Sequence, residues 1–146
     1  MPTGAKLLGA ILFAITGAFA AWIGIPGLPD GRQPGLLVPI AALSGVYFGW
    51  TLAGARPGAT LRQSLVLSLR TVVLMFITTM FFIAGEEAYQ RSIKLRYNGA
   101  IEAVTDIANL MIYFGEMAVQ PPVLTVLLGG ILIGAIFVSW AGRVWE

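Results

Sequence analysis

The sequence predicts an all-α membrane protein: a bundle of four transmembrane helices, with an additional amphipathic helix between the third and fourth spans. Of its 146 residues, 58% are hydrophobic and only 11% are charged, whereas a soluble domain averages about 25% charged residues. Too few charges are present to cover the surface of a soluble protein, and the high hydrophobicity excludes a disordered chain. The formal net charge of +2 is too small for a nucleic-acid-binding surface, so no nucleic-acid partner is expected.

Four long apolar stretches predict the spans, because a helix needs about 20 mostly apolar residues to cross a bilayer. They cover residues 7–25, 36–55, 64–85 and 123–141. Pro121 and Pro122 precede the fourth stretch, where proline suits the first turn of a helix. Pro39 lies inside the second stretch and predicts a kink there, because proline removes a backbone hydrogen bond.

The first stretch also has features of a secretory signal peptide. Lys6 precedes it, and Ala18-Phe19-Ala20 fits a cleavage site of small residues. Its uncharged run is longer than the about 7–15 residues of a signal core. We therefore expect it to be retained as a membrane anchor.

Small residues recur every four positions within three of the spans, and such stripes let two helix backbones approach closely in lipid. The stripes are Ala10, Ala14 and Ala18; Ala41, Gly45, Gly49 and Ala53; and Gly130 and Gly134. They predict a tightly packed bundle but identify no function.

Residues 100–118 predict the amphipathic helix. A rotation of about 100° per residue gathers its polar side chains in one stripe. That stripe contains Glu102, Thr105, Asp106, Asn109, Tyr113 and Glu116. We expect the helix to lie in the membrane interface, because a carboxylate costs about 2.5–3.5 kcal/mol at the bilayer centre. The alternative is a fifth span whose acidic stripe lines a path for cations.

Four spans place both termini on the same side of the membrane. Cytoplasmic segments of membrane proteins are enriched in basic residues, so the distribution of Lys and Arg indicates which side this is. With a cytoplasmic N-terminus, the inner side carries five basic residues: Lys6, Arg56, Arg62, Arg70 and Arg143. The outer side carries four: Arg32, Arg91, Lys94 and Arg96. An acidic interfacial helix also suits the outer leaflet better than the anionic cytoplasmic one. We therefore expect a multi-pass protein of the bacterial inner (cytoplasmic) membrane, in contact with membrane lipids and with both termini cytoplasmic.

Cysteine and histidine are absent from the sequence. Their absence excludes thiol redox chemistry, iron–sulfur clusters and ordinary zinc sites. The sequence also contains no phosphate-binding loop and no nucleophile motif. We therefore expect no enzyme activity, no cofactor and no metal site.

Charged residues in and after the third span are the candidate functional residues. They are Arg70, Glu86, Glu87, Arg91, Lys94, Arg96, Glu102 and Asp106. Arg70 is expected to extend its guanidinium to the inner interface, with an anion held in the bundle as the alternative. Glu86 and Glu87 close the same span as interface residues or bind an ion.

Three further arrangements are open for these candidates. Glu87 and Arg91 are four residues apart and can pair on one helix face. The basic cluster that follows, Arg91, Lys94 and Arg96, contacts lipid head groups or captures an anion. Glu102 and Asp106 are also four apart, and two carboxylates at that spacing can share Ca²⁺ or Mg²⁺.

Four segments along the whole chain carry a family resemblance. They are MPTGAKL at 1–7, LRYNGAIEA at 95–103, PPVL at 121–124 and WAGRVW at 140–145. In this order they resemble segments of the TrgA family, small integral membrane proteins of alphaproteobacteria that are associated with tellurite resistance. The resemblance implies a link to resistance against the tellurite oxyanion.

The residues limit how such resistance arises. Thiols reduce tellurite, and this chain has none. A pore for a divalent anion is also disfavoured, because the longest polar stripe is acidic and repels anions. The sequence favours a non-catalytic accessory protein. The alternatives are a small ion transporter or channel, and a structural or assembly subunit of a homo-oligomer or larger membrane complex.

Overall fold

The computed structural model describes residues 4–28, 35–56, 59–94 and 98–144, and within these ranges every regular element is helical. The elements are α1 (Gly4–Gly24) with a 3-10 turn (Ile25–Gly27), α2 (Leu37–Phe48) with a π-helical turn (Gly49–Ala53), α3 (Leu61–Ile93), α4 (Ala100–Ala118) and α5 (Pro121–Val144). The all-α prediction is confirmed, and the helix predicted at 100–118 has the same bounds in the structure.

Three helices are long and apolar enough to cross a membrane. They are Gly4–Gly27, Leu61–Ile93 and Pro121–Val144. The fourth apolar helix, Leu37–Ala53, is shorter; its 12 α-helical and five π-helical residues extend about 25 Å at 1.5 Å per residue. The hydrocarbon core of a bilayer is about 30 Å thick. The structure is therefore that of a multi-pass membrane protein in which three helices have full spanning length.

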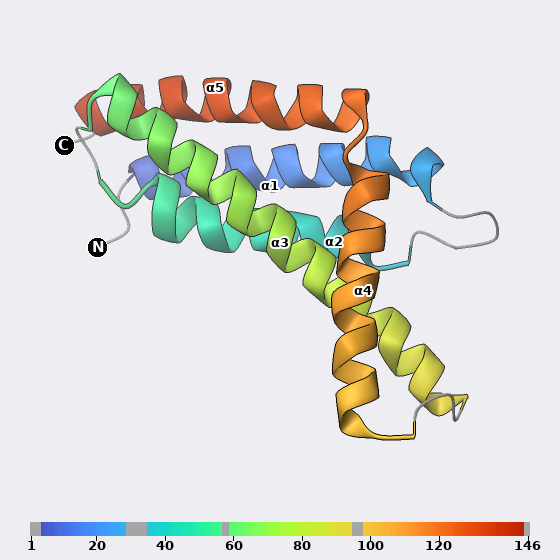
Figure 1. The fold of residues 1–146 in the computed structure, drawn as a ribbon. Helices are drawn as coiled ribbons and strands as arrows, with labels where there is room; N and C mark the ends of the chain where they lie inside the picture. The colour runs from blue at the N-terminus through green and yellow to red at the C-terminus, as the bar shows by residue number, and fades with distance from the viewer. Residues whose placement is uncertain (1–3, 29–34, 57–58, 95–97, 145–146) are drawn as a thin grey trace.

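The helices form a bundle with one projecting arm. Figure 1 shows α1, α2 and α5 running alongside one another, α3 crossing them obliquely, and α4 running across their direction. The arm consists of the last part of α3, residues 86–93, together with α4. The bundle end where α1 begins and α5 finishes is the terminal end, and the opposite end, next to the arm, is the arm end (Figure 1).

Backbone-to-backbone contact joins α1 and α2 in antiparallel orientation. A Cβ atom added to Gly9 would lie 2.7 Å from the carbonyl oxygen of Gly49, and one added to Gly17 would lie 2.5 Å from that of Ala41. A Cβ on Gly45 would overlap the backbone of Phe13. The stripe predicted on the second span is thus confirmed as a packing seam. Such close approach is what small residues allow between helices in lipid.

The stripe predicted on α1 is part of this seam at Ala10 and Ala14. Cβ atoms added to Gly49 and Gly45 would lie 2.9 Å from Ala10 Cα and 2.8 Å from Ala14 N. The shortest contacts with α2 come from the residues one position earlier: Gly9, Phe13 and Gly17.

The stripe of Gly130 and Gly134 packs against α1. A Cβ on Gly134 would lie 2.6 Å from Cζ of Phe13, and a Cβ on Gly130 would overlap Thr16. The Phe13 side chain is 0% exposed, because α2 covers its backbone and Gly134 receives its ring. This confirms the third stripe and makes α1 the helix that joins α2 to α5.

Small hydroxyl residues line the buried face of α3. Ser64, Ser68, Thr71 and Thr79 are all buried. Thr79 donates to the carbonyl oxygen of Met75 at 2.8 Å and lies 3.1 Å from the Ser44 hydroxyl of α2. Such small side chains allow neighbouring helices to approach closely, and the hydroxyls of Thr71 and Thr79 are hydrogen-bonded inside the bundle.

The predicted kink at Pro39 is wrong. Helix α2 begins at Leu37, and Ile40 N makes its first backbone hydrogen bond, to Leu36 O, at 2.9 Å. Pro39 therefore lies in the first turn, where the backbone N–H groups have no partner within the helix in any case. The irregular part of α2 is instead its last turn, where Gly49–Ala53 is π-helical.

Replacing Gly45 by Ala should destabilise the bundle, because the new methyl group has to separate α1 from α2. We expect a loss of about 1–3 kcal/mol, typical of overpacking, seen as a lower midpoint of thermal unfolding in detergent. Gly85→Ala is the matched control, since nothing lies within 4 Å of a Cβ at Gly85. Equal midpoints for the two variants would contradict the α1–α2 seam.

Candidate functional site: the arm junction

Charge is divided unevenly between the two ends of the described structure. All five carboxylates within the described ranges lie on the arm: Glu86, Glu87, Glu102, Asp106 and Glu116. At the terminal end, the charged side chains of the described loops and helix ends are all basic: Lys6, Arg56, Arg62 and Arg143. The arm is therefore the part of the described chain where charged groups of both signs meet.

Arg91 joins the two helices of the arm. Its Nη1 donates to both carboxylate oxygens of Asp106 on α4, at 3.0 and 3.2 Å, and its Nε donates to Glu87 at 3.3 Å. The Arg91 side chain is 33% exposed, and those of Glu87 and Asp106 are 30% and 23% exposed. This partly shielded cluster fixes the first half of α4 to the end of α3.

The pairing of Glu87 with Arg91 confirms the prediction from their spacing. The contact between Arg91 and Asp106 crosses between helices and had no sequence signal. Because two carboxylates already engage its guanidinium, Arg91 does not offer the open cationic surface that anion capture requires.

The remaining candidates lie apart from this cluster. Glu102 accepts a hydrogen bond from the backbone N–H of Asn98 at 3.0 Å, at the start of α4. Glu86 is half-buried on α3, and Lys94 is exposed just after it. Arg70 is exposed on α3, eight residues beyond Arg62, and Arg96 lies outside the described residues.

The alternative of a cation shared by Glu102 and Asp106 gains no support, since each carboxylate has a different partner. Within the described ranges, no group of three or more acidic residues gathers as metal ligands. The chemistry of the junction is therefore that of a structural ion pair.

Helix α4 has three distinct faces. One packs on α3, where Leu110 and Phe114 are buried against Ile83 and Ala88. The second is the polar stripe, of which Glu102, Thr105, Asn109, Tyr113 and Glu116 are exposed. The third is apolar but exposed: Ile101 is 85% exposed, Val104 66% and Ile112 62%. At about 100° per residue the three faces are centred roughly 120° apart.

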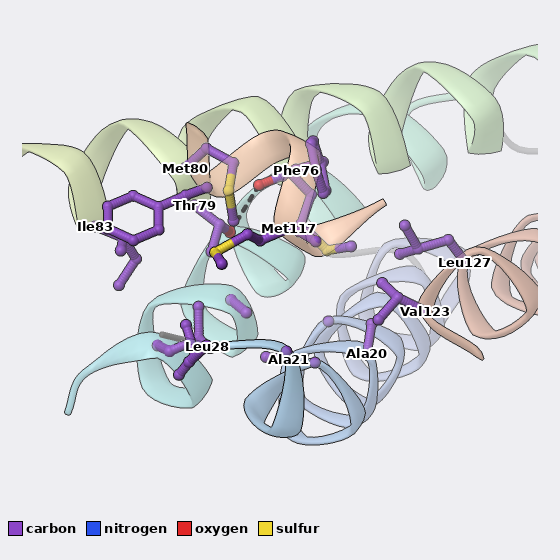
Figure 2. Close-up of a pocket in the computed structure, with 18 residues that line it drawn as sticks. Ala20, Ala21, Leu28, Phe76, Thr79, Met80, Ile83, Met117, Val123 and Leu127 are labelled. Carbon is purple, nitrogen blue, oxygen red and sulfur yellow. Dashed lines mark hydrogen bonds between the residues drawn. The ribbon is translucent and has the colours of Figure 1, made fainter. Parts of the chain in front are cut away.

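An apolar cavity of about 70 Å³ lies at the arm end, bordered by all five helices. Figure 2 shows Thr79 and Met117 on one side of it and Ala20 and Ala21 on the other. This cavity has no signal in the sequence, because its methionines are scattered through apolar stretches. The hydroxyl stripe of α3 was also missed, although the spacing of Ser64, Ser68 and Thr71 suits one helix face.

Comparisons with protein-family models, with curated proteins and with solved structures found no match.

Replacing Asp106 by Asn should loosen α4 from α3, because it removes the charge that holds Arg91 across the junction. Partly exposed ion pairs contribute about 0.2–1 kcal/mol, so amide exchange at 100–106 should accelerate up to about fivefold. Hydrogen exchange with mass spectrometry measures this. Glu116→Gln is the control, being exposed on the same helix. Identical exchange in both variants would mean that the ion pair does not hold α4.

Proposed function

We propose that this chain is a four-span, non-catalytic accessory protein of the bacterial inner membrane, associated with tellurite resistance. Both termini are cytoplasmic, and the arm lies at the outer surface. The observation that carries the proposal is the three-way division of α4.

The division of α4 matches the three environments of a membrane interface. The face with Leu110 and Phe114 is covered by α3, the exposed apolar face with Ile101 suits lipid, and the polar stripe suits water. An amphipathic helix in the interface satisfies its lipid-facing and water-facing sides together. A spanning α4 would instead bring the exposed carboxylates Glu102 and Glu116 into contact with hydrocarbon or with a pore, at high cost.

Helix α2 and the π-helical turn after it supply the fourth crossing. Together their 17 residues are at the lower limit of about 17–25 residues for a transmembrane helix. This segment packs antiparallel to α1 from Ala41 to Gly49, which suits two consecutive crossings. The start of α1 and the end of α5 at one end of the bundle (Figure 1) agree with an even number of spans.

The charge distribution sets the proposed orientation. The terminal end carries Lys6, Arg56, Arg62 and Arg143, and cytoplasmic segments are enriched in such residues. The described residues of the arm contain five carboxylates. Arg91, together with Lys94 directly after α3, supplies only two cationic groups. This charge suits the outer leaflet better than the anionic cytoplasmic surface.

A channel or transporter is less well supported than an accessory role. The buried polar side chains within the described ranges are serines and threonines on the packing seams, and a conducting path needs a continuous polar lining. The exposed stripe of α4 offers a surface for a partner subunit instead. We place the accessory protein in a larger membrane complex through this stripe.

The link to tellurite comes from the resemblance to the TrgA family. We expect host cells that produce the protein to tolerate more tellurite than cells with an empty vector. The purified protein, free of flavin and metal, should not reduce tellurite with NADH as electron donor, because it has no thiol.

The first measurement tests the association with tellurite resistance, and the second tests the non-catalytic role. Equal tolerance in the two strains would remove the tellurite association. Formation of elemental tellurium above the protein-free control, by cofactor-free protein, would overturn the non-catalytic role.

A further inference from the structure

The cavity at the arm end exists because α4 leaves the bundle. Helix α4 packs mainly against α3. The chain reaches the end of α1 just after α4, where a Cβ on Gly27 would overlap the Gln120 side chain. On the α1 side the cavity is bordered by small residues, including Gly17, Ala21 and Gly24. Among these, Gly24 has room for a Cβ, whose nearest neighbour would be Val123 Cγ2 at 3.6 Å, whereas a Cβ on Gly17 would lie 2.5 Å from Ala41 O.

The lining of the cavity selects for an apolar occupant. Met75, Phe76, Met80 and Met117 contribute most of the larger side chains on the α3 and α4 sides. The hydroxyl of Thr79 also lines the cavity, but it already bonds to Met75 O and lies at hydrogen-bond distance from Ser44. A buried water needs two to four polar partners, and the lining supplies no such set. Methionine side chains adapt to flexible apolar ligands.

The size of the cavity also points to a ligand. About 10–15 Å³ suffices for one water molecule, and the cavity of about 70 Å³ is several times larger. Packed protein interiors hold few voids of this kind. Half-buried lining residues on both α1 and α4, such as Ala21 and Met117, place part of the lining near the surface.

We propose that this cavity is a binding site for one hydrocarbon chain, supplied by a membrane phospholipid. The inference goes beyond the proposed function and requires only its membrane location. Lipid chains surround the bundle at high concentration, and the lining matches their chemistry along its whole length. The chain enters where α4 diverges from α1 and lies between Met117 and Ala21.

A second, larger depression does not make an equivalent site. It has a volume of about 430 Å³ and lies between α2 and α3. Its lining includes Leu43, Tyr47 and Phe82, which are 69%, 62% and 53% exposed. It is therefore a groove bordered by exposed side chains, whereas the cavity at the arm end is lined by buried and half-buried side chains.

Photolabelling in vesicles tests the site. The protein is reconstituted in phosphatidylcholine carrying a diazirine at the middle of one acyl chain, and in parallel with a diazirine fatty acid. Adducts are mapped by mass spectrometry. We expect adducts on Met75 or Met80, which are 3% and 7% exposed and are shielded from surrounding lipid. Adducts on the outward-facing Leu128 and Ile136, 59% and 56% exposed, report membrane insertion.

Filling the cavity provides the matched test. Ala21→Leu should lower the methionine adducts at least fivefold and leave the Leu128 adducts unchanged. The control, Ala108→Leu on the exposed face of α4, should leave both unchanged. Cavity labelling by either probe supports the site, and the stronger probe identifies the source of the chain.

Two results would overturn the inference. Adducts only at outward-facing residues in the unmodified protein would exclude the chain site and leave the proposed membrane function intact. Absence of adducts at Leu128 and Ile136 as well would overturn both the site and the proposed function. Since the first result needs no variant, the test does not depend on whether Ala21→Leu folds.

Discussion

The close approach of α1 to its neighbours is the constraint on which the rest of the fold depends. Phe13 lies at its centre: Gly45 of α2 meets its backbone, and Gly134 of α5 receives its ring. In lipid, helices associate through packing and hydrogen bonds because burial of apolar surface gives no advantage. Glycine and alanine at these positions supply the packing, and the hydroxyl pair of Ser44 and Thr79 ties α3 to α2.

The arm follows from the length of α3. Its 33 residues extend about 50 Å, well beyond the about 30 Å of hydrocarbon. Its last turns therefore leave the bundle, and α4 has to return the chain to α5. Arg91 binds α4 to α3 through Asp106, and the chain meets the end of α1 only after α4, at Gln120. The same geometry thus produces both the three distinct faces of α4 and the apolar cavity beside it.

Long-range patterns were predictable from the sequence, and details of contact were not. Composition and apolar length predicted the helical membrane fold, and polar periodicity predicted that α4 is amphipathic. The error at Pro39 came from placing it within a span, whereas its effect depends on which turn it occupies. The alanine spacing on α1 located the seam, but it could not show that Gly9 and Gly17, one residue earlier, make the shortest contacts with α2. The proline-rich segment 29–34, like Arg96, lies outside the described residues.

The contacts of the candidate site also differ in how far the sequence predicts them. Glu87 and Arg91 lie on one helix, so their spacing predicted their contact. Asp106 reaches Arg91 only because α3 and α4 fold back on each other, and the cavity depends on the angle at which they do so. No local pattern encodes that angle. Methionines within apolar stretches carry no signal of the space they border.

The most direct test is to measure on which side of the membrane single introduced cysteines can be labelled. Because the natural chain has no cysteine, each label reports one position. Gln33→Cys, Ala55→Cys, Glu102→Cys and Glu116→Cys would be labelled with an impermeant maleimide in intact spheroplasts. Four spans with an interfacial α4 predict outside labelling at Gln33, Glu102 and Glu116, and labelling at Ala55 only after permeabilisation. Glu102 and Glu116 on opposite sides, or Gln33 and Ala55 on the same side, would contradict the proposed architecture.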